Sequence, residues 1–428
     1  MKRTKLALQI RESFWFLPSL YGFFAFIAAI ASVNVDFHFS TEQLESVFPD
    51  LLVANSKLAV TMLSTLTQSI LTITTITFST IMIVLTTFSG QFSPRTLQNF
   101  VADRATQRVL AVFIAGFLYN LVTLLLMEGS GNKSLLVTPA LSVLSGILCA
   151  AFFVFFIHHV AGWVQVNQLI NKITRETLST INRVYKEQSR FSSTEKTELE
   201  IDRQDRYVIR AENAGYVAMF DFQKLISLAA QNNTIIHFHI HIGDYVLKDT
   251  ELLSYQADSR HPETTENQFR QTIKLEPERT SVQDIEFGIQ KLVEIALRAI
   301  SPAINDPHTA INCINRIGTI LSELSKQPRR NSTLCDNNGD IRLIIRQRDL
   351  DHYLYKGLYQ IRHYAREDLS VTVGILQALK LIAETSDPST RQTVHSFAEY
   401  IIEGFDHEVL EDKDQKYLQR TWRDLVQN

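Results

Sequence analysis

Three histidines alternate with apolar residues along one short segment, the spacing that brings side chains to the same face of a β-strand. This spacing would place His237, His239 and His241 on one face and the apolar residues Ile236, Phe238, Ile240 and Ile242 on the other. Three neighbouring imidazoles could share a metal ion such as zinc. The alternation also fits an ordinary half-buried strand whose outer face carries the histidines. We adopt this second interpretation and therefore expect no metal and no other cofactor.

The segment from Ser301 to His308 is the second candidate, because its two prolines fix a connection between two helical patterns. Asp306 before Pro307 is a favourable start for a helix. The N-terminus of a helix can also receive an anionic group, but the carboxylate of Asp306 argues against one. We interpret the segment as a structural turn and keep a ligand or interface site as the alternative. The residues of that alternative site are Asn305, Asp306 and His308.

Hydroxyl groups crowd the stretch from Leu58 to Pro94, which contains no charged side chain. On a helix, one narrow stripe of this stretch is polar, and apolar residues such as Leu63 and Ile70 lie away from it. Threonine and serine can bond to a carbonyl one turn earlier or let helices pack closely. The stripe could instead face water or ions in a pore. Its members are Thr61, Thr65, Gln68, Thr72, Thr75, Ser79 and Thr86.

Four apolar segments can cross a bilayer, which takes about 20 residues. Their approximate bounds are 14–35, 58–94, 109–127 and 135–160. Lysine and arginine gather before the first segment, between the second and third, and after the fourth. The positive-inside rule therefore predicts that both termini are cytosolic. If the stripe lines a pore, the charges at its mouths are Asp50 and Lys57 outside and Arg95 and Arg104 inside.

The composition changes after the fourth apolar segment, from few charges to many. The chain then divides into a four-span transmembrane domain (1–166), a helical connector (167–204), a small β-rich module (205–258) and a mainly helical cytosolic domain (259–428). Within the module, IGDYVLKDTELL resembles the turn and strand of lipoyl- or biotinyl-like barrels, without the lysine motif that carries their prosthetic group. The expected fold class is an α-helical membrane protein with a cytosolic α+β half that contains a barrel-like module.

Local signals set the expected bounds of the last helices. Ser281 with Asp284 indicates a capping box for a helix that reaches Ala299. Further helices are expected from 307 to about 325, from about 350 to 384, and from 389 to 426. The short apolar run IRLII between them has the character of a strand.

Several classes of function find no support in the sequence. The 428 residues carry a net charge of −3, which gives no reason to expect nucleic acid as a partner. The cysteines, Cys149, Cys313 and Cys335, have no metal-like spacing, and a disulfide framework is excluded. Phosphate-binding, dinucleotide-binding, metalloprotease and nucleophile-elbow motifs are absent. We therefore expect no enzyme.

Three long stretches, residues 78–125, 214–246 and 283–318, together resemble the bacterial membrane-protein family catalogued as "domain of unknown function 2254". They include the runs FSTIMIVLTTFSGQFSPRTL, AGYVAMFDFQKLISLAAQ and AISPAINDPHTAINCINRIG. The resemblance implies a multi-pass protein of the bacterial inner membrane with four spans and a cytosolic C-terminal half. It supplies no catalytic residues.

Two functions from different classes remain open. The first is an oligomeric channel or pore, in which the hydroxyl-rich second span lines a polar path and the cytosolic half assembles and regulates it. The second is a membrane-anchored sensory or interaction module, whose spans only tether the cytosolic domain. The expected partners are the lipid bilayer, further copies of the chain and, for a pore, ions.

Overall fold

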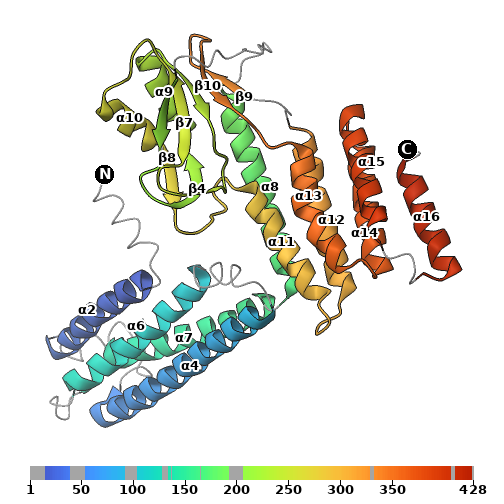
Figure 1. Cartoon of the computed structure of the whole chain (residues 1–428). Coiled ribbons are helices and arrows are strands. Elements are labelled where there is room, and N and C mark those ends of the chain that lie inside the picture. Colours follow the sequence, from blue (N-terminus) through green and yellow to red (C-terminus); the bar gives the residue numbers. More distant parts are fainter. Residues whose placement is uncertain are drawn as a thin grey trace. The chain divides into compact units, whose positions relative to one another are not determined.

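The computed structural model describes residues 15–38, 54–91, 104–127, 134–135, 137–163, 165–191, 206–327, 332–405 and 410–426. The chain divides into two compact units, Met1–Gln165 and Val166–Asn428. Figure 1 traces it from the N-terminus in blue to the C-terminus in red.

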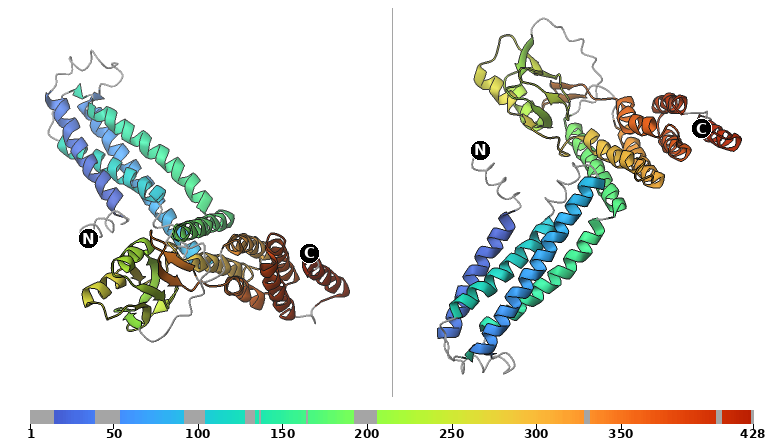
Figure 2. Two further views of the ribbon diagram at one scale, coloured as in Figure 1. Left: turned by 90° about the horizontal axis from the view of Figure 1, so that it is seen from above. Right: turned by 60° about the horizontal axis from the view of Figure 1, so that its bottom comes forward.

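The described residues of the first unit form a bundle of four helices, each long and apolar enough to span a membrane. The helix α6 packs against each of the other three, and the helices run side by side along the unit (Figure 2). The four predicted apolar helices are therefore confirmed. The helices are α2 (Phe16–His38), α4 (Ser56–Gln91), α6 (Arg104–Met127) and α7 (Val137–Trp163). Two short strands, β1 (Ala54–Asn55) and β2 (Ser134–Leu135), pair antiparallel.

One contact between α6 and α7 depends on a glycine. A Cβ atom added at Gly116 of α6 would lie 2.7 Å from Sγ of Cys149 on α7, well inside van der Waals contact. Small residues allow two membrane helices to meet backbone to backbone in this way. Buried apolar side chains such as Leu63, Phe113 and Phe156 form much of the bundle core.

The second unit begins with α8 (Val166–Ser189), an amphipathic helix that packs on α11 (Ile285–Ala299) and α12 (Pro307–Ser325). A glycine again allows two helices to pack closely, because a Cβ at Gly288 of α11 would collide with Thr177 of α8. In the chain, only residues 164 and 165 separate α8 from the last apolar helix, α7.

Two sheets make up the β-rich part of the second unit. The five-stranded sheet has the order β3 (Arg206–Arg210), β7 (Glu251–Gln256), β5 (Ile235–Phe238), β10 (Ile341–Ile345), β9 (Ser332–Cys335). The three-stranded sheet has the order β6 (Tyr245–Val246), β4 (Gly215–Phe220), β8 (Ile273–Glu276). Strands β5 and β10 are parallel, and the other neighbours are antiparallel. The helices α9 (Phe222–Gln231) and α10 (Glu263–Arg270) accompany the sheets.

The predicted barrel-like module is not confirmed, because the strands form two separate sheets and not a closed barrel. The physical reason is the position of β10, the strand expected from the run IRLII. β10 pairs with β5, and β9 pairs with the other side of β10. The sheet is therefore extended at the edge where a barrel would close. An apolar core shared by strands of both sheets and α9, which includes Phe220, Leu225 and Phe238, holds this part together.

Four further helices follow: α13 (Leu350–Tyr364), α14 (Leu369–Glu384), α15 (Pro388–Glu403) and α16 (Asp412–Val426). The expected start of α12 at Pro307 is confirmed, and its N-cap is Asp306. The expected capping box at Ser281 is wrong, since Asp284 is itself the N-cap of α11. The two long helices expected after residue 350 are each interrupted, and Asp368 caps the new helix α14 after the first break.

Candidate functional site

The polar stripe lies on the side of α4 that faces away from the rest of the bundle. Every member of the stripe is exposed in the single chain. On the opposite face, Leu63, Ile70 and Ile81 are buried, as the sequence pattern predicted. The stripe thus faces the outside of the four-helix bundle and not its interior.

Most hydroxyl groups of the stripe bond to their own helix. The threonines donate to the carbonyl oxygen four residues earlier at distances of 2.8 to 2.9 Å. This bond satisfies each hydroxyl proton but leaves oxygen lone pairs on the exposed face. Gln68 and Ser79 have no side-chain hydrogen bond within the described part of the chain. They are the two members of the stripe that still need partners.

Two of the predicted mouth charges lie within the described residues. Lys57 is in the first turn of α4, and Arg104 is the first residue of α6. Ala59 shares a buried cluster with Met127, the last residue of α6. Lys57 and Arg104 therefore lie at opposite ends of the bundle. The other two mouth charges, Asp50 and Arg95, fall outside the described residues.

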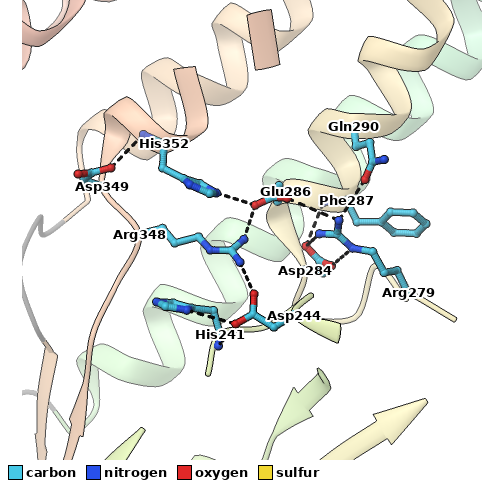
Figure 3. A network of polar contacts seen from close by, with 10 residues as sticks. All are labelled: His241, Asp244, Arg279, Asp284, Glu286, Phe287, Gln290, Arg348, Asp349 and His352. Carbon is cyan, nitrogen blue, oxygen red and sulfur yellow. Dashed lines mark hydrogen bonds and ion pairs between the residues drawn. The ribbon is translucent and has the colours of Figure 1, made fainter. Parts of the chain in front are cut away.

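A network of charged side chains joins the β-rich part of the second unit to its helical part (Figure 3). Its centre is Arg348, between β10 and α13, whose guanidinium contacts the carboxylates of Asp244 and Glu286. Glu286 also accepts a hydrogen bond from Nε2 of His352 at 2.8 Å. Arg348 thus connects the turn before β6 to the first turn of α11, and Glu286 in turn connects α11 to the first turn of α13.

Arg279 forms the other half of this network. Its guanidinium donates to both carboxylate oxygens of Asp284, at 2.7 and 2.9 Å, and lies 3.5 Å from Glu286. Asp284 also accepts a hydrogen bond from the backbone N–H of Phe287 at 2.9 Å and so caps α11. The side chain of Asp284 is only 2% exposed, and its charge is balanced within the protein.

Both carboxylates that contact Arg348 stay ionised at neutral pH. Burial alone would raise the pKa of Glu286, but the hydrogen bond with His352 and the charges of Arg348 and Arg279 lower it below its usual value. Burial also opposes ionisation of Asp244, and hydrogen bonds from His241 together with the charge of Arg348 lower its pKa. The network therefore acts as a set of ion pairs.

A cavity of about 90 Å³ lies beside the network, among α8, the sheets and the starts of α11 and α13. This volume has room for several water molecules. Tyr185 of α8 and Tyr353 of α13 line it together with Glu286 and Arg348. Burial raises the pKa of Tyr185 to about 12, so its phenol is a protonated donor at neutral pH. The cavity thus offers hydrogen-bond donors beside apolar walls.

The three histidines do not share a site. His241 contacts Asp244 at 3.4 Å, and Nε2 of His239 lies 2.9 Å from Oγ of Ser254. His237 is buried, so its expected place on an outer face is wrong. It belongs to β5, a strand that is buried on both faces, since Ile236 and Phe238 on the opposite face are buried as well. Among the described residues, no group of three or more potential ligands is placed to hold a metal.

The turn before α12 has the expected structural role at Asp306. Its carboxylate accepts hydrogen bonds from Thr309, at 3.1 Å from the backbone N–H and 2.6 Å from the hydroxyl, and these bonds lower the pKa of Asp306. Asn305 has a positive φ of 50°. Asn305 and His308 are exposed, and Asn305 borders an open groove with His363. A ligand or interface at this groove remains a prediction.

Sequence reasoning missed Arg348, Glu286 and His352. Arg348 and Asp244 are 104 positions apart, and Arg348 and Glu286 are 62 positions apart. No local spacing reveals such a contact. The one available signal was a run of arginines directly after an apolar strand, which marks charge at the edge of a core.

Four apolar helices followed by a two-sheet and multi-helix unit define a multi-span membrane protein with a folded α+β part. The chain belongs to the family described as predicted membrane protein (DUF2254), which matches residues 11–381. The resemblance inferred from the sequence is therefore confirmed.

Similar curated proteins come from mycobacteria. The uncharacterized protein Mb1321c of Mycobacterium bovis is 29% identical over 352 residues, which are 79% of this chain and 66% of the relative. The uncharacterized protein Rv1290c of Mycobacterium tuberculosis matches with the same identity and coverage. This chain thus spans about two thirds of the length of these relatives. No solved structure gives a significant match.

Proposed function

We propose that this chain is the subunit of an oligomeric channel of the bacterial inner membrane, and that the stripe of α4 lines a polar path between copies. The observation that carries the proposal is the exposure of the stripe. Polar side chains continue for several turns along the outer face of a helix long enough to span a membrane. Such a face needs a polar neighbour outside the single chain.

The cost of leaving these side chains in lipid supports the proposal. Leucine inserts more favourably than threonine, serine or glutamine at membrane depth. The amide of Gln68 has two donor protons and an acceptor oxygen, and lipid tails satisfy none of them. Water or a second copy would supply the missing hydrogen bonds. The lone pairs of the threonine hydroxyls would then face the same polar space.

A groove beside the stripe offers a place for a neighbouring helix. It lies between α4 and α7, has a volume of about 510 Å³ and is lined mostly by apolar atoms. Thr61 and Thr65 of the stripe form one wall. On the other wall, Gly146 and Ala150 are four residues apart, the small-residue spacing that lets membrane helices approach closely. A helix seated here would bring a second copy next to the stripe.

The charges at the ends of the bundle would set ion preference. With both termini in the cytosol, Asp50 and Lys57 would lie at the outer mouth, and Arg95 and Arg104 at the inner one. The stripe itself carries no fixed charge. Selectivity would therefore come from these rings of charge and not from the middle of the path.

The second unit would assemble and regulate the channel. Its first helix, α8, follows α7 in the chain after residues 164 and 165, and α8 contributes Tyr185 to the cavity beside the charged network. A change in that cavity would therefore act on the segment that continues directly from the last span.

Cysteine accessibility along α4 tests the proposal. After Cys149, Cys313 and Cys335 are replaced, single cysteines at Thr72, Thr75 and Ser79 should react with a small water-soluble thiol reagent in native membranes. A cysteine at Phe78 is the matched control, since Phe78 is also exposed in the single chain but lies on a different side of α4 from the stripe. Equal resistance at all four positions would show that the stripe faces lipid or packs dry.

The second candidate function is a membrane-anchored sensory or interaction module, favoured by the cavity beside Arg348. In that case the spans only tether the second unit. Imaging the purified full-length protein separates the two functions. A ring with a central axis supports the channel, and a monomer with intact spans supports the tether.

A further inference from the structure

A second set of polar side chains is buried inside the four-helix bundle, away from the exposed stripe. None of them is more than 6% exposed, and they come from three helices, α2, α6 and α7. We call this set the interior cluster. It consists of Ser32, Tyr119, Asn120, Thr123, Thr138 and Ser142.

The hydroxyl of Tyr119 lies at the centre of the interior cluster. It donates to Oγ of Ser32 at 3.1 Å and lies 3.5 Å from the carbonyl oxygen of Thr138. Thr123 and Ser142 also neighbour this hydroxyl. Three helices thus direct polar groups at one point inside the bundle.

The cluster extends along the bundle in both directions from Tyr119. At one end, the carboxylate of Asp36 accepts the backbone N–H of Thr138 at 2.8 Å and so caps α7. At the other end, the amide of Asn120 donates to Oγ of Ser145 at 2.8 Å. Thr138 and Ser145 are seven residues apart on α7, which is about 10 Å along a helix.

Three atoms of the cluster have no hydrogen-bond partner among the described residues. They are Oδ1 of Asn120, Oγ1 of Thr123 and Oγ1 of Thr138, and each belongs to a side chain that is 0% exposed. An unsatisfied buried polar group costs about 1–3 kcal/mol, and a bilayer core offers no outside water to relieve the cost. Three such atoms in one cluster point to a missing partner.

We propose that the interior cluster binds ordered water molecules and forms a hydrated cavity inside the first unit. Water fits because it both donates and accepts, and the orphan hydroxyls have protons as well as lone pairs to satisfy. A bound cation could interact with the lone pairs of these oxygens but could not accept hydrogen bonds from the hydroxyl protons. The polar contacts of the cluster run from Asp36, which accepts from the backbone N–H of Thr138, to Gly116, whose carbonyl oxygen accepts from the amide of Asn120 at 2.7 Å.

The consequence is a bundle that is wet over part of its length. Water that reaches from Thr138 to Ser145 shortens the dry barrier of a ~30 Å hydrocarbon core by about 10 Å. This water lies within one chain, so the inference stands whether or not copies form a channel.

Radiolytic hydroxyl-radical labelling of the full-length protein in lipid nanodiscs tests the proposal, with mass spectrometry as the readout. Ordered water next to a side chain generates radicals in place, so Tyr119 should be oxidised rapidly despite its burial. Phe113 is the internal control, because it lies on the same helix, is 0% exposed and belongs to the apolar core. Equal protection of Tyr119 and Phe113 would overturn the proposal.

A pair of isosteric variants sharpens the test. Thr123→Val removes a partner of the water and should lower both Tyr119 labelling, by at least twofold, and the melting temperature. Thr67→Val is the control, because the buried Thr67 hydroxyl already donates to the carbonyl of Leu63 at 2.7 Å, and it should leave Tyr119 labelling unchanged. A higher melting temperature for Thr123→Val with unaltered labelling would show a dry cluster and overturn the proposal.

Discussion

Nε2 of His352 lies 2.8 Å from Oε2 of Glu286, and this contact joins the first turn of α13 to the first turn of α11. The same carboxylate also holds Arg348, which reaches across to Asp244 in the β-rich part. One half-buried carboxylate and the arginine bound to it therefore hold the two parts of the second unit together, an arrangement we call the clamp.

Glu286→Gln should destabilise the second unit. The substitution keeps the size of the side chain but leaves Arg348 and Arg279 short of a counter-charge in a half-buried site. Breaking a buried ion pair costs about 3 kcal/mol or more. Chemical denaturation followed by circular dichroism measures the loss. Glu323→Gln is the control, since Glu323 pairs with Lys326 at the surface, where the pair contributes less than about 1 kcal/mol. Equal losses in the two variants would refute the clamp.

The clamp also predicts how stability depends on pH. The folded pKa values of Glu286 and Asp244 are lowered, so their contribution is complete above their unfolded pKa values of about 4. It is lost as pH falls through the lower folded values. The melting temperature should therefore change little between pH 7 and 5 and fall steeply below about pH 4. In Glu286→Gln, a smaller fall of the melting temperature below about pH 4 would support the role of Glu286 in this pH dependence. An identical fall in the variant and the original protein would contradict it.

The membrane part of the structure follows closely from sequence pattern, because one helical period decides which face of α4 is apolar. Leu63 and Ile70 are buried as that period requires. The pattern could not say what lies opposite the polar stripe. The interior cluster was missed for a related reason: Tyr119, Asn120 and Thr123 are scattered within an apolar run, and only the packing of three helices brings them to Ser32 and Thr138.

In the second unit, the residue pattern predicted features formed by neighbours in the chain, such as helix caps. It did not predict contacts between residues far apart in the chain. Asp306 before Pro307 starts α12 because the cap and the helix are adjacent in the chain. The strand β10 pairs with β5 across more than 100 residues, and this pairing turned an expected barrel into an extended sheet. The contacts of Arg348 depend on that same distant pairing.

Gly288→Ala should weaken the packing of α8 on α11. The added Cβ would collide with Thr177, and neither helix backbone can retreat without disturbing the core. Overpacking of this kind typically costs about 1–3 kcal/mol. The double variant with Thr177→Ala should recover most of the loss in the free energy of unfolding. Failure of the double variant to recover would place the cause elsewhere than in this contact.

The distribution of lysine and arginine predicts that both termini are cytosolic. Cysteines introduced at Ser46 and Ser193, in a background without Cys149, Cys313 and Cys335, should differ on intact cells. Ser46→Cys should react with a membrane-impermeant thiol reagent, and Ser193→Cys should react only after lysis. Labelling of Ser193→Cys from outside would reverse the predicted orientation.

The conductance of the purified full-length protein in a planar bilayer tests the central claim most directly. If the stripe of α4 lines a polar path, the protein conducts ions, and Thr72→Leu combined with Ser79→Leu reduces the current at least severalfold without altering assembly. Phe78→Leu, on the same helix but on a different side from the stripe, leaves the current unchanged. A bilayer that stays silent with protein shown to be assembled and correctly inserted would contradict the claim.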